Sequence, residues 1–131
     1  MTKEYTDIIV LNSTLLGKLL SDLDDSVLNK YVNILNTQNV KKFFADAELV
    51  LTANILFHND LNVIRASKEA GVHRNTTIYR LEKIKKLLGL DIKKFEDAVT
   101  LQIIMLTKKL VDKNKIRAKR ETKKLDIQDL H

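Results

Sequence analysis

The stretch of sequence that decides the fold is NVIRASKEAGVHRNTTIYRLEKIKKLL, residues 62–88. Its first part is short and begins at Asn62, a polar residue suited to an N-cap. It ends at Gly71, the residue type that most easily takes a positive φ at a tight turn. A second helical pattern follows over residues 74–88 and stops at Gly89. The stretch therefore predicts two helices joined by a short turn, with Asn62 as the first N-cap.

The same stretch has the features that a helix-turn-helix requires. Ala66 and Ser67 are small enough for two helices to cross closely, Gly71 supports the turn, and Val72 is the first apolar anchor. The second helix then carries an apolar stripe for burial, formed by Leu81, Ile84 and Leu88. This spacing predicts a helix-turn-helix over residues 62–88.

The rest of the chain is helical in pattern. Proline is absent and glycine occurs three times, so little interrupts a helix. Apolar residues at helical spacing predict further helices over about residues 8–23, 27–35, 46–57 and 94–110. We expect an all-α domain of about six helices over residues 1–110. Residues 111–131 are basic and poor in apolar side chains, which predicts a loosely ordered tail.

Positive charge is concentrated in the half of the chain that contains the helix-turn-helix. Residues 1–60 carry 5 Lys+Arg and 8 Asp+Glu, whereas residues 61–131 carry 18 and 9. The isoelectric point of about 9.5 suits a polyanionic partner, because cations placed on phosphates release condensed counterions. Ribosomal and membrane-surface proteins are also basic, so the charge alone leaves those classes open.

Several function classes lack support in the sequence. Without cysteine there is no disulfide and no cysteine-based metal site, and His58, His73 and His131 lack ligand spacing, so we expect no metal and no cofactor. No Gly-rich phosphate loop or nucleophile with a base is present, so we do not expect an enzyme. The first residues do not resemble a signal peptide, and no apolar run reaches the roughly 18 residues of a membrane span, which predicts a cytoplasmic protein.

The second helix of the motif supplies the candidate binding residues. At about 100° per residue, its polar and mostly basic face lies opposite the apolar stripe. Recognition helices contact base edges mainly through their N-terminal residues, which predicts base contacts by His73, Arg74, Asn75, Thr76 and Tyr79. Phosphate contacts are predicted for Arg80, Lys83 and Lys86. Arginine suits guanine and asparagine suits adenine, since each can form a bidentate pair.

Two of these residues have an alternative interpretation. His73 stands where a helix N-cap is expected, and a cap residue can also touch phosphate. The Tyr79 ring could instead lie half-buried along the neighbouring helix, with its hydroxyl in water.

The residues 73–81, His-Arg-Asn-Thr followed by Tyr-Arg-Leu, resemble the C-terminal helix-turn-helix of PucR-type bacterial regulators of purine and sugar-diacid catabolism. The resemblance extends over about residues 15–110, because residues 15–20, 48–53 and 95–98 look like the flanking helices of that family. A weaker similarity to Fis-type helix-turn-helix proteins covers the motif itself. Both relationships imply binding to double-stranded DNA.

The chain departs from the PucR-type pattern in three places. Such regulators carry a large N-terminal sensory region, and here about 14 residues precede the similarity, so no small-molecule effector is inferred. Thr77 stands where the family has an apolar anchor, and Ile78 where it has a polar or basic residue. We expect Ile78 to take over the anchoring while Thr77 hydrogen-bonds locally. The basic tail has no recognised counterpart, and it could add phosphate contacts.

These observations lead to one expected function and one alternative. We expect sequence-specific binding of double-stranded DNA by a small bacterial transcriptional regulator that acts as a homodimer. Alternatively, the helix-turn-helix docks or antagonises another regulator as a protein-interaction module. The apolar first and last helices favour dimerisation but do not indicate which of them forms the interface.

Overall fold

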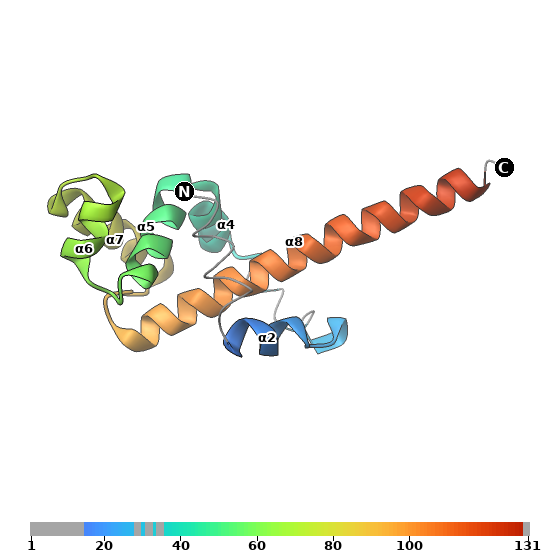
Figure 1. Cartoon of the computed structure of the whole chain (residues 1–131), viewed down its shortest axis with the longest axis horizontal. Helices are drawn as coiled ribbons and strands as arrows, with labels where there is room; N and C mark the ends of the chain where they lie inside the picture. The colour runs from blue at the N-terminus through green and yellow to red at the C-terminus, as the bar shows by residue number, and fades with distance from the viewer. Residues whose placement is uncertain (1–14, 28–29, 31–32, 34–35, 130–131) are drawn as a thin grey trace.

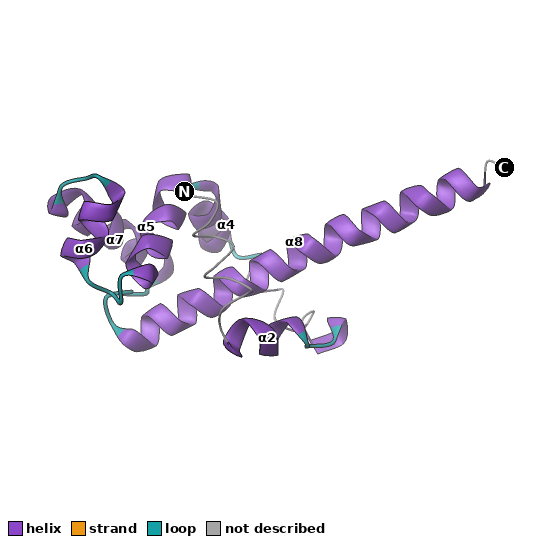
Figure 2. Cartoon of the chain, in the orientation of Figure 1, coloured by secondary structure: helices purple, strands orange, loops and turns teal. Residues whose placement is uncertain are grey.

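The described part of the chain is built from α-helices. The computed structural model describes residues 15–27, 30, 33 and 36–129. In chain order its helices are α2 (Leu15–Ser21), α4 (Gln38–Ala45), α5 (Ala47–His58), α6 (Val63–Ala70), α7 (Arg74–Leu88) and α8 (Phe95–Asp129). No strand occurs over these residues, where Figure 2 shows helices and loops only. The prediction of an all-α fold is confirmed.

Polar side chains begin α4, α5 and α6. The Asp46 carboxylate accepts hydrogen bonds of 3.1 and 3.3 Å from two backbone N–H groups in the first turn of α5. Asn62 accepts from the backbone N–H of Arg65 at 3.0 Å, so the predicted cap of α6 is confirmed. Thr37 caps α4 in the same way. Each cap satisfies backbone donors that the first helical turn leaves without a partner.

Glycines end the two helices of the predicted motif. Gly71 follows α6 with a φ of 69°, and Gly89 follows α7 with a φ of 72°. A residue with a Cβ is strained in this left-handed conformation, whereas glycine adopts it readily. The predicted bounds of both helices agree with the structure for this reason.

The sequence pattern did not indicate α4, and part of the predicted N-terminal structure lies outside the described residues. Val40 and Phe43 of α4 are buried, but two helical turns show too little periodicity to stand out. Of the helix predicted over residues 8–23, the structure describes residues 15–23, which include α2. Most of the helix predicted over residues 27–35 is not described.

The core is centred on α5, in which residues 49–57 are all buried or half-buried. A helix of this kind must be covered all round, and α4, α6 and α7 each pack against it. The largest fully buried side chains come from several helices and the loop before α8: Phe43, Leu56, Ile84, Ile92, Leu101 and Leu106. The first half of α8 joins the same core through Leu101 and Met105.

The last helix is longer than expected. We predicted a helix to about Leu110 and a loosely ordered tail over residues 111–131, whereas α8 continues to Asp129. In Figure 1 its C-terminal part extends away from the other helices, while α2 lies against its middle. No glycine or proline follows Gly89, and Lys, Arg, Glu and Leu are good helix formers, so the helix continues beyond its packed part.

A pair of hydroxyl groups joins the two helices of the motif. Ala66 and Ser67 of α6 are buried, as predicted for the helix crossing. The Ser67 hydroxyl lies 2.7 Å from the Thr77 hydroxyl of α7 and 2.7 Å from the carbonyl oxygen of Val63. Because a hydroxyl both donates and accepts, these three groups form a chain of hydrogen bonds across the crossing.

This arrangement corrects the prediction that Ile78 would anchor α7. Thr77 is only 4% exposed and lies in the buried interface, whereas Ile78 is 38% exposed. The hydroxyl pair explains the difference, since Thr77 can be buried without an unsatisfied polar atom. Thr77 does form a hydrogen bond, but to the neighbouring helix rather than locally.

We expect Thr77→Val to lower the free energy of unfolding by about 1 kcal/mol, because it removes one partner of a buried hydrogen bond. The double variant Ser67→Ala with Thr77→Val should recover part of this loss, since it replaces both partners with apolar groups. Urea unfolding of the parent chain, the two single variants and the double variant measures the coupling.

Equal stability of Thr77→Val and the parent chain would show that the hydroxyl pair contributes nothing. Strictly additive losses in the double variant would show that the two hydroxyls act independently.

Candidate nucleic-acid interface

The helix that offers the candidate binding residues begins at His73. The Nδ1 atom of His73 accepts a hydrogen bond from the backbone N–H of Asn75 at 3.0 Å, so the N-cap prediction is confirmed. His73 is exposed, and it therefore combines a structural role with a polar surface.

Packing fixes the rotation of α7. Thr77, Leu81 and Ile84 are buried on one side of the helix. The opposite side, at about 100° per residue, is polar. Six of the eight predicted contact residues are exposed: His73, Arg74, Asn75, Tyr79, Lys83 and Lys86. Thr76 and Arg80 are half-buried at one edge of this surface.

Tyr79 lies in the middle of the exposed side. Its side chain is 63% exposed, which contradicts the alternative that its ring is half-buried. The Lys83 Nζ lies 5.6 Å from the centre of the Tyr79 ring, within the range of a cation–π contact. This contact places an aromatic ring beside a positive charge on the same helix face.

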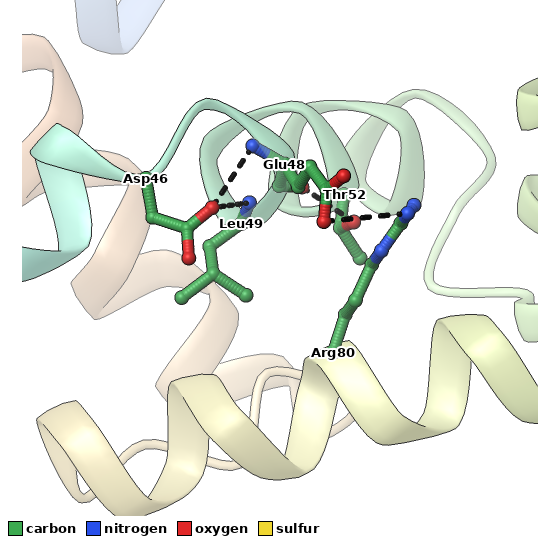
Figure 3. Close-up of polar contacts among 5 residues, drawn as sticks. All are labelled: Asp46, Glu48, Leu49, Thr52 and Arg80. Carbon is green, nitrogen blue, oxygen red and sulfur yellow. Dashed lines mark hydrogen bonds and ion pairs between the residues drawn. The ribbon is translucent and has the colours of Figure 1, made fainter.

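Arg80 is held by a carboxylate from another helix. Its side chain is 20% exposed, and its guanidinium lies 3.5 Å from the carboxylate of Glu48 in the first turn of α5 (Figure 3). Glu48 is itself largely exposed. Arg80 is therefore already paired within the chain, and this pairing could not be predicted from the sequence because Glu48 is remote from the motif.

A further cation from α4 lies beside the lysines of α7. Lys42 and Asp46 line a shallow hollow together with Lys83 and Lys86. Sequence reasoning missed Lys42 because α4 was not predicted. Lys41 and Lys42 form a basic pair in the sequence, but only packing of α4 against α7 brings Lys42 to this surface.

Other kinds of site have no support in the described part of the chain. Over those residues, no group of three or more His, Asp or Glu side chains could hold a metal ion. None of the helices described there has an apolar stretch long enough to span a lipid bilayer.

Comparison with known proteins identifies the same region. The family model described as the PucR C-terminal helix-turn-helix domain matches residues 49–107. The purine catabolism regulatory protein of Bacillus subtilis (strain 168) is 31% identical over 94 residues, which are 72% of this chain and 18% of that protein. The carbohydrate diacid regulator of Escherichia coli (strain K12) is 37% identical over 49 residues, 37% of this chain and 13% of that protein.

These matches concern a small part of the relatives, since the chain covers less than a fifth of either regulator. No solved structure shows a significant match. The matched residues contain most of α5, all of α6 and α7 and the first part of α8, and α5 and α6 both pack against α7. Residues 49–107 of this chain are therefore similar to the PucR C-terminal helix-turn-helix domain.

Proposed function

We propose that the chain binds double-stranded DNA in a sequence-specific manner through α7 and acts as a bacterial transcriptional regulator. The observation that carries the proposal is the exposed polar and basic side of α7, opposite Thr77, Leu81 and Ile84. The matched family is a DNA-binding regulatory domain and not an enzyme family, and two relatives are named as regulators. A cytoplasmic location follows from the proposed partner.

The N-terminal end of α7 is the part that would read bases. Arg74 and Asn75 are exposed in the first turn, where a recognition helix enters the major groove. An arginine can pair with the O6 and N7 atoms of guanine, and an asparagine with the N6 and N7 atoms of adenine. Tyr79 would continue this surface with Thr76 at its edge, and His73 at the N-cap would contact a base edge or a phosphate.

The lysines farther along α7 would bind phosphates. Lys83 and Lys86 are exposed and Lys42 lies nearby, so three cations share one surface. Such contacts set the position of a protein on the duplex without reading its sequence. Arg80 could join them only by exchanging Glu48 for a phosphate.

We expect Arg74→Ala and Asn75→Ala each to weaken binding by roughly tenfold to a hundredfold and to relax the preference for one base. The probe is a duplex selected by the parent chain from a random DNA pool, and the measurement is a gel shift at one salt concentration. Asn39→Ala and Lys93→Ala, both at exposed positions outside α7, serve as matched controls.

Circular dichroism should first establish that all four variants are folded. If both α7 variants then bind with the affinity and sequence preference of the parent, the proposed recognition helix is wrong.

The Glu48–Arg80 pair gives a second test of the same surface. We expect Glu48→Gln to strengthen DNA binding by roughly twofold to fivefold, because the exposed Glu48 carboxylate would no longer compete with phosphate for Arg80. The dependence of affinity on salt should steepen by about one unit, the contribution of one more phosphate contact. Fluorescence anisotropy titrations between low and moderate salt measure both quantities.

Two controls separate competition for Arg80 from a simple loss of negative charge. Glu96→Gln removes an exposed carboxylate from the first turn of α8 and should leave the salt dependence unchanged. In an Arg80→Ala background, Glu48→Gln should have no effect on the slope. A full effect in that background would rule out the exchange.

We further propose that the chain acts as a homodimer. Leu15 and Leu19 of α2 are 75% and 58% exposed and lie one helical turn apart, beside the middle of α8. Covering these leucines with a second copy would remove apolar surface from water. A two-fold pair would also place two α7 helices about one DNA turn apart, roughly 34 Å, and would select an inverted repeat.

We expect the double variant Leu15→Gln with Leu19→Gln to sediment as a monomer under conditions in which the parent chain sediments as a dimer. Phe95→Gln is the matched control, because Phe95 is also exposed but lies at the start of α8. Dimers of unchanged stability in the leucine variant would place the interface elsewhere.

A protein-interaction role is the second candidate, and one observation favours it. Ile64 of α6 and Ile78 of α7 are both exposed, so the helix-turn-helix presents apolar as well as basic surface. The two functions differ in their response to salt. A DNA-binding surface gives an affinity for duplex that falls steeply with salt, whereas a flat response would mean that few phosphates are contacted.

A further inference from the structure

The C-terminal part of α8 leaves the body of the protein where its sequence changes. Leu101, Leu106 and Leu110 are buried, but Lys113 and Arg120 are exposed. Figure 1 shows this end of the helix extending beyond every other described element. At the base of this segment the Asn114 amide donates a hydrogen bond to the Asp25 carboxylate at 3.2 Å, and beyond it the helix extends away from the other described elements. The composition of this segment must therefore indicate what it contacts.

The charge of α8 changes at the same point. Residues 95–112 contain two Lys and three Asp or Glu, a net charge of −1. Residues 113–124 contain seven Lys or Arg and one Glu, a net charge of +6. We call residues 113–124 the basic arm. The arm thus carries a charge equal to the formal net charge of the whole chain, +6, on a helix that stands away from the core.

Four of the seven basic positions share one side of the helix. Positions 113, 117, 120 and 124 follow the spacing i, i+4, i+7 and i+11, which returns to the same face of an α-helix at each step. This row rises about 16 Å from its first to its last position, at 1.5 Å per residue. Phosphates along one strand of a duplex present a comparable row of negative charge.

We propose that the basic arm binds the phosphates of double-stranded DNA next to the segment that α7 reads. The inference rests on the proposed DNA binding by α7. A polyanion neutralises the repulsion between neighbouring cations of the arm, whereas pairing with the arm of a second copy would add to that repulsion. From Leu110 to the end of the arm the helix rises about 20 Å, the length of roughly six base pairs.

The test compares the parent chain with an arm variant that carries Lys113→Gln, Arg117→Gln, Arg120→Gln and Lys124→Gln. Glutamine is a good helix former without charge, so α8 should persist, and circular dichroism checks this. The control variant carries Lys18→Gln, Lys30→Gln, Lys93→Gln and Lys94→Gln, which removes the same charge from exposed positions outside the arm. Arg74→Ala reports separately on binding through α7.

Affinity is measured against salt on a duplex of about 30 base pairs and on one of about 12, little more than one helical turn. On the long duplex, the log–log slope of the arm variant should be shallower than that of the parent by about 3 to 4 units, the value for four lost phosphate contacts. On the short duplex the two slopes should agree within about one unit, because flanking DNA is missing. The control variant should keep the parent's slope on both.

Three outcomes would overturn the inference. If Arg74→Ala weakens binding while the arm variant keeps the parent's slope on the long duplex, the arm does not touch DNA although α7 does. If the control variant loses as much slope as the arm variant, only net charge matters. If the parent chain binds neither duplex, the proposed function and the arm's role fail together.

Discussion

Burial of one side of α7 against α5 and α6 determines which side chains that helix can offer to a partner. Thr77, Leu81 and Ile84 lie in this interface, and α5 is apolar enough to be covered by helices all round. Once the buried side is fixed, the geometry of an α-helix fixes the opposite side. The exposed positions of Asn75, Tyr79 and the lysines are thus a consequence of core packing.

Polar contacts refine this packing at two places. The Ser67–Thr77 hydroxyl pair lies at the crossing of α6 and α7. If burial were the only requirement there, two apolar side chains would meet it. Hydrogen bonds depend on direction as well as distance, so the pair also restrains how the two helices slide and rotate. The Glu48–Arg80 pair ties the edge of the polar face to α5. Both pairs act on the surface proposed to meet DNA.

Charge is arranged according to packing. Acidic residues predominate in the first half of the sequence, and the strongly basic segments are α7 and the end of α8. Most cations of α7 lie on the side that the core leaves exposed, although Arg80 is half-buried, and the basic arm of α8 follows the buried Leu110. Cations cost little where water still solvates them, and the half-buried Arg80 has the Glu48 carboxylate as its partner. The exposed lysines of α7 and the exposed Lys113 and Arg120 of α8 therefore remain accessible to a polyanion.

The sequence by itself determined the features that depend on local chemistry. Helix starts and helix ends depend on backbone groups within a few residues, so they could be predicted at Asn62, His73, Gly71 and Gly89. The all-α fold class could be predicted from the sequence as well. Only the tertiary structure decided which of Thr77 and Ile78 is buried, because Ser67 lies in another helix and supplies the partner. It also decided the pairing of Arg80 with Glu48 and the place of Lys42, since both involve helices that meet α7 only through packing.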